Sequence, residues 1–164
     1  MKLYCRDGIV IATHDDDQDV PASAYGDGIV IVYSATAVAT DSPVPTLDHA
    51  GLKACAREKR KSIIAGGCTV TVDGIAMPVW ADADTISALT GLSLMASANP
   101  ALTASWKARD GQFYDLNAAD ITTLATGVAT FVQAAFAAES AVVADIDADN
   151  ITTADEIEAA DWPA

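Results

Sequence analysis

Hydrophobic and polar positions along the chain follow two periods, one typical of helices and one of strands. Apolar side chains recur at steps of three and four residues over 118–145, which predicts one long helix that forms the spine of the fold. Shorter helices are predicted over 52–65, before a Gly-Gly pair, and over 82–99, from an aspartate cap to an asparagine that precedes proline. The predicted buried stripe of the long helix comprises Ile121, Leu124, Val128, Phe131, Val132, Ala135, Val142 and Ile146.

Asp-Gly pairs between apolar runs predict three β-hairpins, because this dipeptide favours tight turns with positive φ. At Asp73 and Gly74 a two-residue loop places alternate apolar side chains on one face of the hairpin. The same geometry at Asp110 and Gly111 predicts that Ala108 pairs with Phe113 and that Trp106 lies beside them on a second apolar face; Gly111 then needs positive φ. The third hairpin turns at Asp7 and Gly8, and a second Gly-Ile-Val-Ile run at 28–31 predicts a strand that pairs with its neighbours.

These elements predict an α+β fold, with short β-hairpins and a small antiparallel sheet packed on a few helices. A β-rich docking module is expected over residues 1–40 and an α+β body over 52–164. Residues 41–51 are expected to link them, because the stretch "DSPVPT" contains two prolines and no periodicity. With 164 residues, the chain is long enough to bury a hydrophobic core.

Charge and cysteine content exclude several classes of function. The net charge of −14 opposes non-specific binding to nucleic acid or to anionic membranes. Cys5, Cys55 and Cys68 are far apart and form no C-x-x-C motif, which predicts reduced thiols, two of them buried, rather than a zinc site or disulfides. The N-terminus lacks the pattern of a secretion signal, so synthesis in a cytoplasm is expected.

Candidate chemical groups are few. His14 and His49 stand apart in the sequence, and neither a nucleophile motif nor a phosphate-binding loop occurs. We therefore predict no enzyme activity, no catalytic residue and no cofactor. The uncharged run 121–138 is long enough for a membrane span, but its threonines and glutamine favour a core or intersubunit helix. A basic run is expected on a solvated helix face, with contact to an acidic neighbour: Lys53, Arg57, Lys59, Arg60 and Lys61.

The stretch "DIDADNITTADE" resembles a calcium loop, with Asp145, Asp147 and Asp149 at alternate positions and Glu156 at the twelfth. Asn150 stands at the position where such loops place glycine. A competing interpretation makes Thr152 or Thr153 the N-cap of a short helix with Glu156 in its first turn. We favour the cap and predict no metal ligand. The aspartates at 15, 17 and 19 are interpreted as a solvated turn.

Four motifs stand out in the body of the chain: the Gly66-Gly67 pair, a W-K-x-x-D-G-x-F hairpin at 106–113, "VQAAFAAE" at 132–139, and a terminal Trp162-Pro163. In these motifs the chain, over about residues 50–164, resembles a family of domains of unknown function that is common in tailed-bacteriophage genomes. Such proteins are similar to those encoded among tail, baseplate and tail-fibre genes. The resemblance implies a virion component or an assembly factor, with no known catalysis.

The expected function is that of a structural component of a phage tail, in the baseplate, tail tip or tail-fibre connector. Its expected partners are other tail or baseplate proteins and copies of itself, and its expected location is the virion after synthesis in the bacterial host cytoplasm. An assembly chaperone of the tail fibre that is absent from the virion is the alternative. A membrane-active tail-tip component is a third possibility, suggested by the uncharged run 121–138.

Overall fold

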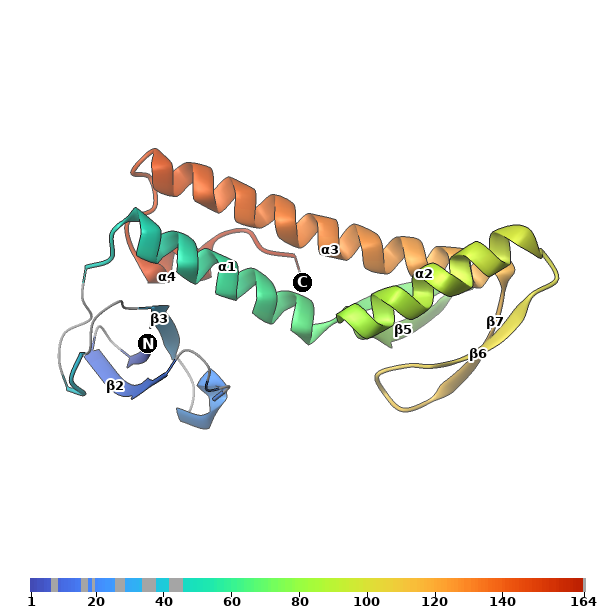
Figure 1. The fold of residues 1–164 in the computed structure, drawn as a ribbon, viewed down its shortest axis with the longest axis horizontal. Coiled ribbons are helices and arrows are strands. Elements are labelled where there is room, and N and C mark those ends of the chain that lie inside the picture. Colours follow the sequence, from blue (N-terminus) through green and yellow to red (C-terminus); the bar gives the residue numbers. More distant parts are fainter. Residues whose placement is uncertain are drawn as a thin grey trace. The chain divides into compact units, whose positions relative to one another are not determined.

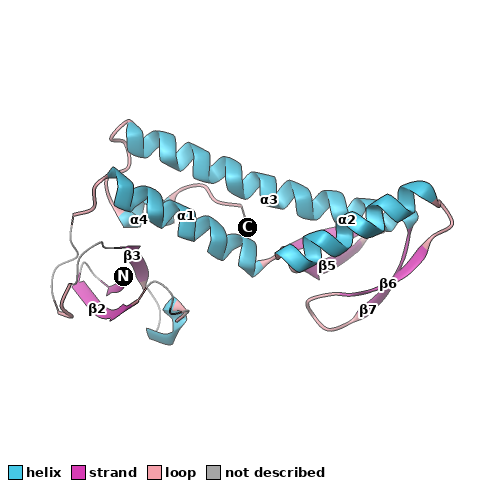
Figure 2. Ribbon diagram, in the orientation of Figure 1, coloured by secondary structure: helices cyan, strands magenta, loops and turns pink. Residues whose placement is uncertain are grey.

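The computed structural model describes residues 1–6, 9–15, 18, 20–25, 29–33, 38–41 and 46–163. Within these residues the predicted α+β fold is confirmed, with four α-helices and three small antiparallel sheets (Figures 1 and 2). The chain forms two compact units. Unit 1 comprises Met1–Lys59 and Glu139–Asp161, and unit 2 comprises Arg60–Ala138 and Trp162–Ala164.

The N-terminal sheet of unit 1 has three strands in the order β2-β1-β3. Strand β1 (Lys2–Arg6) pairs antiparallel with β2 (Ile9–His14) and with β3 (Val30–Tyr33), which confirms the predicted pairing of the repeated run. Arg6 pairs with Ile9, and the predicted turn at 7–8 lies outside the described residues. A short 3₁₀ helix, η1 (Ala22–Tyr25), precedes β3. The core of this sheet consists of Leu3, Cys5, Val10 and Val32.

Three helices contribute to unit 1: the first part of α1 (His49–Gly66), the last part of α3 (Ala118–Asp147) and the short α4 (Ala154–Ala159). Helix α4 lies against β3, and its Ala154 packs on the core of the N-terminal sheet. The β-rich segment therefore shares one compact unit with helical residues from the far end of the chain. Most of the predicted linker's proline-rich stretch, residues 42–45, lies outside the described residues. The buried helical side chains are Leu52, Cys55, Ala56, Val142, Ile146 and Ile157.

The first hairpin of unit 2 has the predicted two-residue turn. Strands β4 (Cys68–Val72) and β5 (Ile75–Val79) pair antiparallel, with Val70 opposite Met77. Asp73 and Gly74 have φ of 48° and 79°, as a type I′ turn requires. The inner face of this hairpin is buried, as predicted, except that Ile75 next to the turn is 50% exposed.

The second hairpin departs from its predicted register. Strand β6 (Thr103–Lys107) pairs with β7 (Phe113–Asn117) so that Lys107, not Ala108, lies opposite Phe113. Gly111 has the predicted positive φ, 84°, but the Ala108 amide bonds to the Gln112 carbonyl and closes a three-residue loop. Because a shift by one residue exchanges the faces of a strand, Phe113 lies outside at 69% exposure. The predicted face that combined Trp106 with Phe113 was wrong; Trp106 pairs with Tyr114.

Helix α2 (Ala83–Ala98) begins and ends as predicted. The Asp82 carboxylate accepts a hydrogen bond from the Thr85 amide at 2.7 Å, and Asn99 is the C-cap. This hydrogen bond lowers the pKa of Asp82. On α2, Leu89 and Ala96 are buried, whereas Met95 is 55% exposed.

The long helix α3 starts at a cap formed by Asn117 and Asp120, whose side chains and backbone amides bond to each other. Its predicted stripe is confirmed: seven of the eight side chains are buried, and Val132 is partly buried against the core of unit 2. The helix approaches β4 closely at Gly127, where an added Cβ would lie 2.5 Å from Val70 Cγ1. That core joins α3 to the hairpins and to α2 through Val72, Met77, Val79, Leu89 and Leu116.

Candidate protein-docking surface

The segment that resembles a calcium loop is divided between two helices. Helix α3 continues through Asp145 to Asp147, so the first three positions of the sequence match are helical. Asp149, not Asn150, takes the left-handed conformation, with φ of 58°. The amide and side chain of Asn150 bond to Asp145 instead. The segment is therefore a helix C-terminus followed by a turn.

Glu156 forms the predicted cap. Thr153 is the N-cap of α4, and its hydroxyl accepts a hydrogen bond from the Glu156 amide at 3.3 Å. The Glu156 carboxylate accepts hydrogen bonds from the amides of Thr152 at 2.8 Å and Thr153 at 3.0 Å. These hydrogen bonds lower the pKa of Glu156, and the bond from the Thr152 amide has the largest effect. Because the folded pKa is the lower one, the cap stabilises the fold above pH 4.5 and this stabilisation is lost as pH falls through the folded pKa.

We expect calcium to leave thermal stability unchanged relative to magnesium at matched ionic strength, because Glu156 is engaged by the cap and Asp147 by Lys53. The measurement is thermal unfolding in calcium, magnesium and chelator. A bound metal at a hundredfold excess over its Kd would instead add about 2.7 kcal/mol of stability. A rise of several degrees specific to calcium and absent in Glu156→Gln would show a metal site. As a separate check on the cap, Thr153→Ala should lower the free energy of unfolding by about 1 kcal/mol, because the N-cap hydrogen bond is lost.

The predicted basic run pairs with acidic and aromatic neighbours. Lys53 Nζ lies 2.5 Å from Asp147, and Lys59 bonds to Glu158, so the expected contacts with acidic side chains are confirmed. His49 joins the first pair, with Nδ1 3.8 Å from Asp147 Oδ1, and its Nε2 lies 2.9 Å from Asp149 Oδ1. All of these groups are partly exposed, so each ion pair contributes modestly to stability. The pairs of His49 and Lys53 connect the start of α1 to the end of α3 and the turn after it, and the Lys59–Glu158 pair connects α1 to α4.

His14, the other histidine, belongs to an aromatic cluster on the N-terminal sheet. Its ring packs edge-on against Tyr4 at a centroid distance of 5.2 Å. Nδ1 lies 2.9 Å from Gln18 Oε1, and Nε2 bonds to the Tyr25 hydroxyl. Tyr4 is fully buried and donates its hydroxyl to the Val20 carbonyl. The cluster connects the strands to η1 and leaves both ring nitrogens of His14 occupied.

All three cysteines are buried thiols, one more than the sequence predicted. Burial is the main cause that raises the pKa of Cys5 to about 11, and the Asp155 carboxylate adds to it. Burial also raises the pKa of Cys68. A protonated, buried thiol is a poor nucleophile and a poor metal ligand. Within the described residues, moreover, no three His, Cys, Asp or Glu side chains gather as metal ligands.

Arg109 connects three segments of unit 2 that are distant in sequence. Its guanidinium donates a hydrogen bond to the Gly66 carbonyl and lies 5.2 Å from the centre of the Trp80 ring. Its backbone amide donates to the Pro78 carbonyl at 2.9 Å. The contact satisfies a carbonyl at the end of α1 and fixes the loop of the second hairpin on β5. We interpret it as structural.

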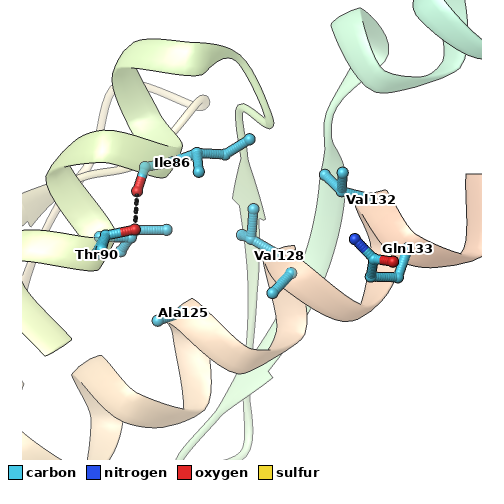
Figure 3. Close-up of a pocket in the computed structure, with 8 residues that line it drawn as sticks. Ile86, Thr90, Ala125, Val128, Val132 and Gln133 are labelled. Atoms are coloured by element: carbon cyan, nitrogen blue, oxygen red, sulfur yellow. Dashed lines mark hydrogen bonds between the residues drawn. The ribbon is translucent and has the colours of Figure 1, made fainter. Parts of the chain in front are cut away.

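An apolar hollow lies between α2 and α3 within unit 2 (Figure 3). Its volume is about 180 Å³. The Thr90 hydroxyl donates to the Ile86 carbonyl at 2.7 Å, which leaves the exposed amide of Gln133 as the principal polar group at the edge. The lining residues are Ile86, Leu89 and Thr90 of α2 with Ala125, Val128, Ala129, Val132 and Gln133 of α3.

Large apolar side chains extend this hollow along both helices. Leu94 follows Thr90 by one turn of α2 and is 69% exposed. Phe136 follows Val132 by one turn of α3, is 45% exposed, and lies under the Arg60 guanidinium at 4.2 Å. We call the hollow together with Leu94 and Phe136 the α2/α3 face. The sequence contains no ionisable residue over 85–106 or 121–138, which supply every residue of this face.

Helix α3 is also long and apolar enough to cross a membrane, judged by length and composition alone. In unit 2, however, Ile121, Leu124, Val128, Phe131 and Ala135 belong to one stripe that is buried in the protein. Core helices with this pattern pass the same test of length and composition.

Comparison with known proteins identifies a family for most of the chain. The profile of a family described as a domain of unknown function, DUF4376, matches residues 48–161. The match includes all four α-helices and both hairpins of unit 2. No curated protein and no solved structure matches the chain. Since the matched region covers well over half of its length, the chain belongs to the DUF4376 family of domains of unknown function.

Proposed function

We propose that this protein is a structural component of a bacteriophage tail, in the baseplate, tail tip or tail-fibre connector, and that it acts through protein–protein contacts. The observation that carries the contact role is the α2/α3 face, which combines an apolar hollow with exposed Leu94 and Phe136 and has no charge of its own. Exposed apolar patches with few charges are typical of protein interfaces. The assignment to a phage tail rests on the resemblance of the hairpin at 106–113 and of the helix at 132–139.

The composition of α3 supports a contact role. Its solvent side between 121 and 138 consists mainly of threonine and alanine, such as Thr126, Ala129 and Thr130, all exposed. Small side chains allow a second backbone to approach closely, and no charge has to be desolvated when the surface is covered. A helix that is merely solvated usually carries charges on its outer face. The outer face of α3 therefore favours contact with another protein.

Adding a charge to this helix should block assembly and leave the fold intact. We expect Thr126→Glu to reduce incorporation into phage particles at least tenfold while the thermal unfolding temperature stays within a few degrees, because Thr126 is exposed. The control is Ser140→Glu, an exposed position on the same helix outside the uncharged run. The measurement is quantitative mass spectrometry of purified particles. Equal incorporation of both variants would argue against a contact on this side of α3.

The same measurement separates the proposed function from its rivals. A tail component is present in purified particles at a fixed copy number, whereas an assembly chaperone is present in infected cells and absent from particles. A membrane-active component would partition with detergent or lipid vesicles through the apolar helix α3. Absence of the protein from the particle would overturn the structural role.

A further inference from the structure

We propose that the α2/α3 face binds a second copy of this chain in a two-fold symmetric dimer. The inference rests on the proposed function, because it names the partner for the same face. The distribution of charge along the chain, the shape of the face and the chemistry of Gln133 all favour a second copy as the partner.

Charge restricts where two copies can meet. In a two-fold interface the same surface of both copies takes part, so a charged surface brings like charges together. The sequence of unit 1 has seventeen acidic and five basic residues, a net charge of −12. Unit 2 has six acidic and four basic residues, a net charge of −2. Within unit 2 the runs 85–106 and 121–138 have none, so the α2/α3 face can meet its own copy without repulsion.

The α2/α3 face has both a projecting side chain and a hollow, which are the two parts that a self-complementary contact needs. Leu94 projects from α2 with 69% of its surface exposed. The hollow of about 180 Å³ starts one turn away, at Thr90. In a two-fold arrangement Leu94 of each copy can enter the hollow of the other, since every contact occurs twice. A projecting leucine seated between apolar side chains of a facing helix is the usual packing of paired helices.

The polar group at the edge of the hollow is also self-complementary. The Gln133 amide has an acceptor oxygen and a donor nitrogen, so it can pair with the same amide or with backbone groups of a second copy. The Thr90 hydroxyl already donates a hydrogen bond to the Ile86 carbonyl, so a second copy that covers Thr90 leaves this donor paired. Arg60, whose guanidinium lies over the Phe136 ring, would lie at the rim, where charges stay hydrated.

The first test is the molar mass of the full chain in solution, by sedimentation equilibrium over a range of concentrations. We expect a species of twice the chain mass of 16.9 kDa. Leu94→Asp should raise the dimer dissociation constant at least about 30-fold, as loss of a central contact residue does. Met95→Asp is the matched control, because Met95 is also exposed but points about 100° away around α2. Its dissociation constant should stay within about threefold.

The second test is the register of the two copies. We expect Leu94→Cys mixed with Ala129→Cys to form a disulfide-linked heterodimer under mild oxidation, faster than either variant alone. Ala129→Asp on the opposite wall of the hollow should weaken the dimer as Leu94→Asp does, so the proposal stays testable if one variant folds poorly. A monomer at all concentrations, or equal effects of Leu94→Asp and Met95→Asp, would overturn the dimer. If the protein is a monomer but is found in particles, the dimer is wrong and the proposed function still holds. If the protein is a dimer but is absent from particles, the proposed function is wrong and the dimer still holds.

Discussion

Gly127→Ala is expected to lower the free energy of unfolding by about 1–3 kcal/mol, although alanine is the better helix former. The added Cβ would lie 2.5 and 2.8 Å from the two methyl carbons of Val70, well inside normal contact. Val70 is buried on β4 and branched at Cβ, which restricts the rotation that would move its methyl groups away. Helix α3 must then shift away from the hairpin, which loosens the core of unit 2. Thermal or denaturant unfolding measures the loss.

Gly91→Ala is the control, because Gly91 also lies inside a helix but has open space at its Cβ. That variant should gain about 0.5–1 kcal/mol from helix propensity. The double variant Gly127→Ala with Val70→Ala should be more stable than the sum of the two single effects, by about 1 kcal/mol or more, because the smaller residue makes room for the new methyl group. Additive effects, or a stable Gly127→Ala variant, would show that the close approach of α3 and β4 is not a tight contact.

Gly67→Ala is expected to cost about 2–4 kcal/mol, through two effects at one position. Gly67 has φ of +71°, a conformation that strains any residue with a Cβ. The new Cβ would also lie 2.3 Å from the Val79 carbonyl oxygen and 3.2 Å from the Arg109 guanidinium. Because the first of these is a backbone atom of β5, the clash can be relieved only by moving the hairpin. Denaturant unfolding, with the slope checked for two-state behaviour, gives the loss of stability.

Gly111→Ala separates the two effects. Gly111 has a similar φ of +84°, but nothing lies within 4 Å of its Cβ position. Strain alone should therefore cost about 1 kcal/mol for alanine there, and about 1–3 kcal/mol for valine. If Gly67→Ala and Gly111→Ala lower the free energy of unfolding by the same amount, the close approach of Gly67 to Val79 contributes nothing and the whole effect is backbone strain.

The sequence determined those features that depend on residues a few positions apart. Asp82 begins α2 because its carboxylate reaches the Thr85 amide, and Thr153 begins α4 because Glu156 completes the reciprocal pair of bonds. The Asp73-Gly74 turn follows from the two positive φ values that a type I′ turn needs. The length and buried stripe of α3 follow from helical periodicity. All of these could be predicted because their stabilising contacts are local.

The uncharged character of the α2/α3 face was likewise visible in the sequence, but its hollow was not. The run 121–138 has no ionisable residue, which already indicated a covered or intersubunit helix. That Ile86 and Thr90 of α2 form the other wall of the hollow depends on how α2 packs on α3. No spacing within either helix contains that information. The candidate site could therefore be predicted as a helix and not as a surface.

The tertiary structure alone decided which side chains are inside where local rules allow two outcomes. One additional residue in the loop before β7 moved Phe113 to the solvent side, since both turn lengths are compatible with an Asp-Gly pair. The contact of Arg109 with Trp80 and Gly66, and the approach of Gly127 to Val70, join residues that are between 29 and 57 positions apart. Helical periodicity and turn chemistry describe the chain over a few residues, whereas these contacts depend on how the finished elements pack against one another.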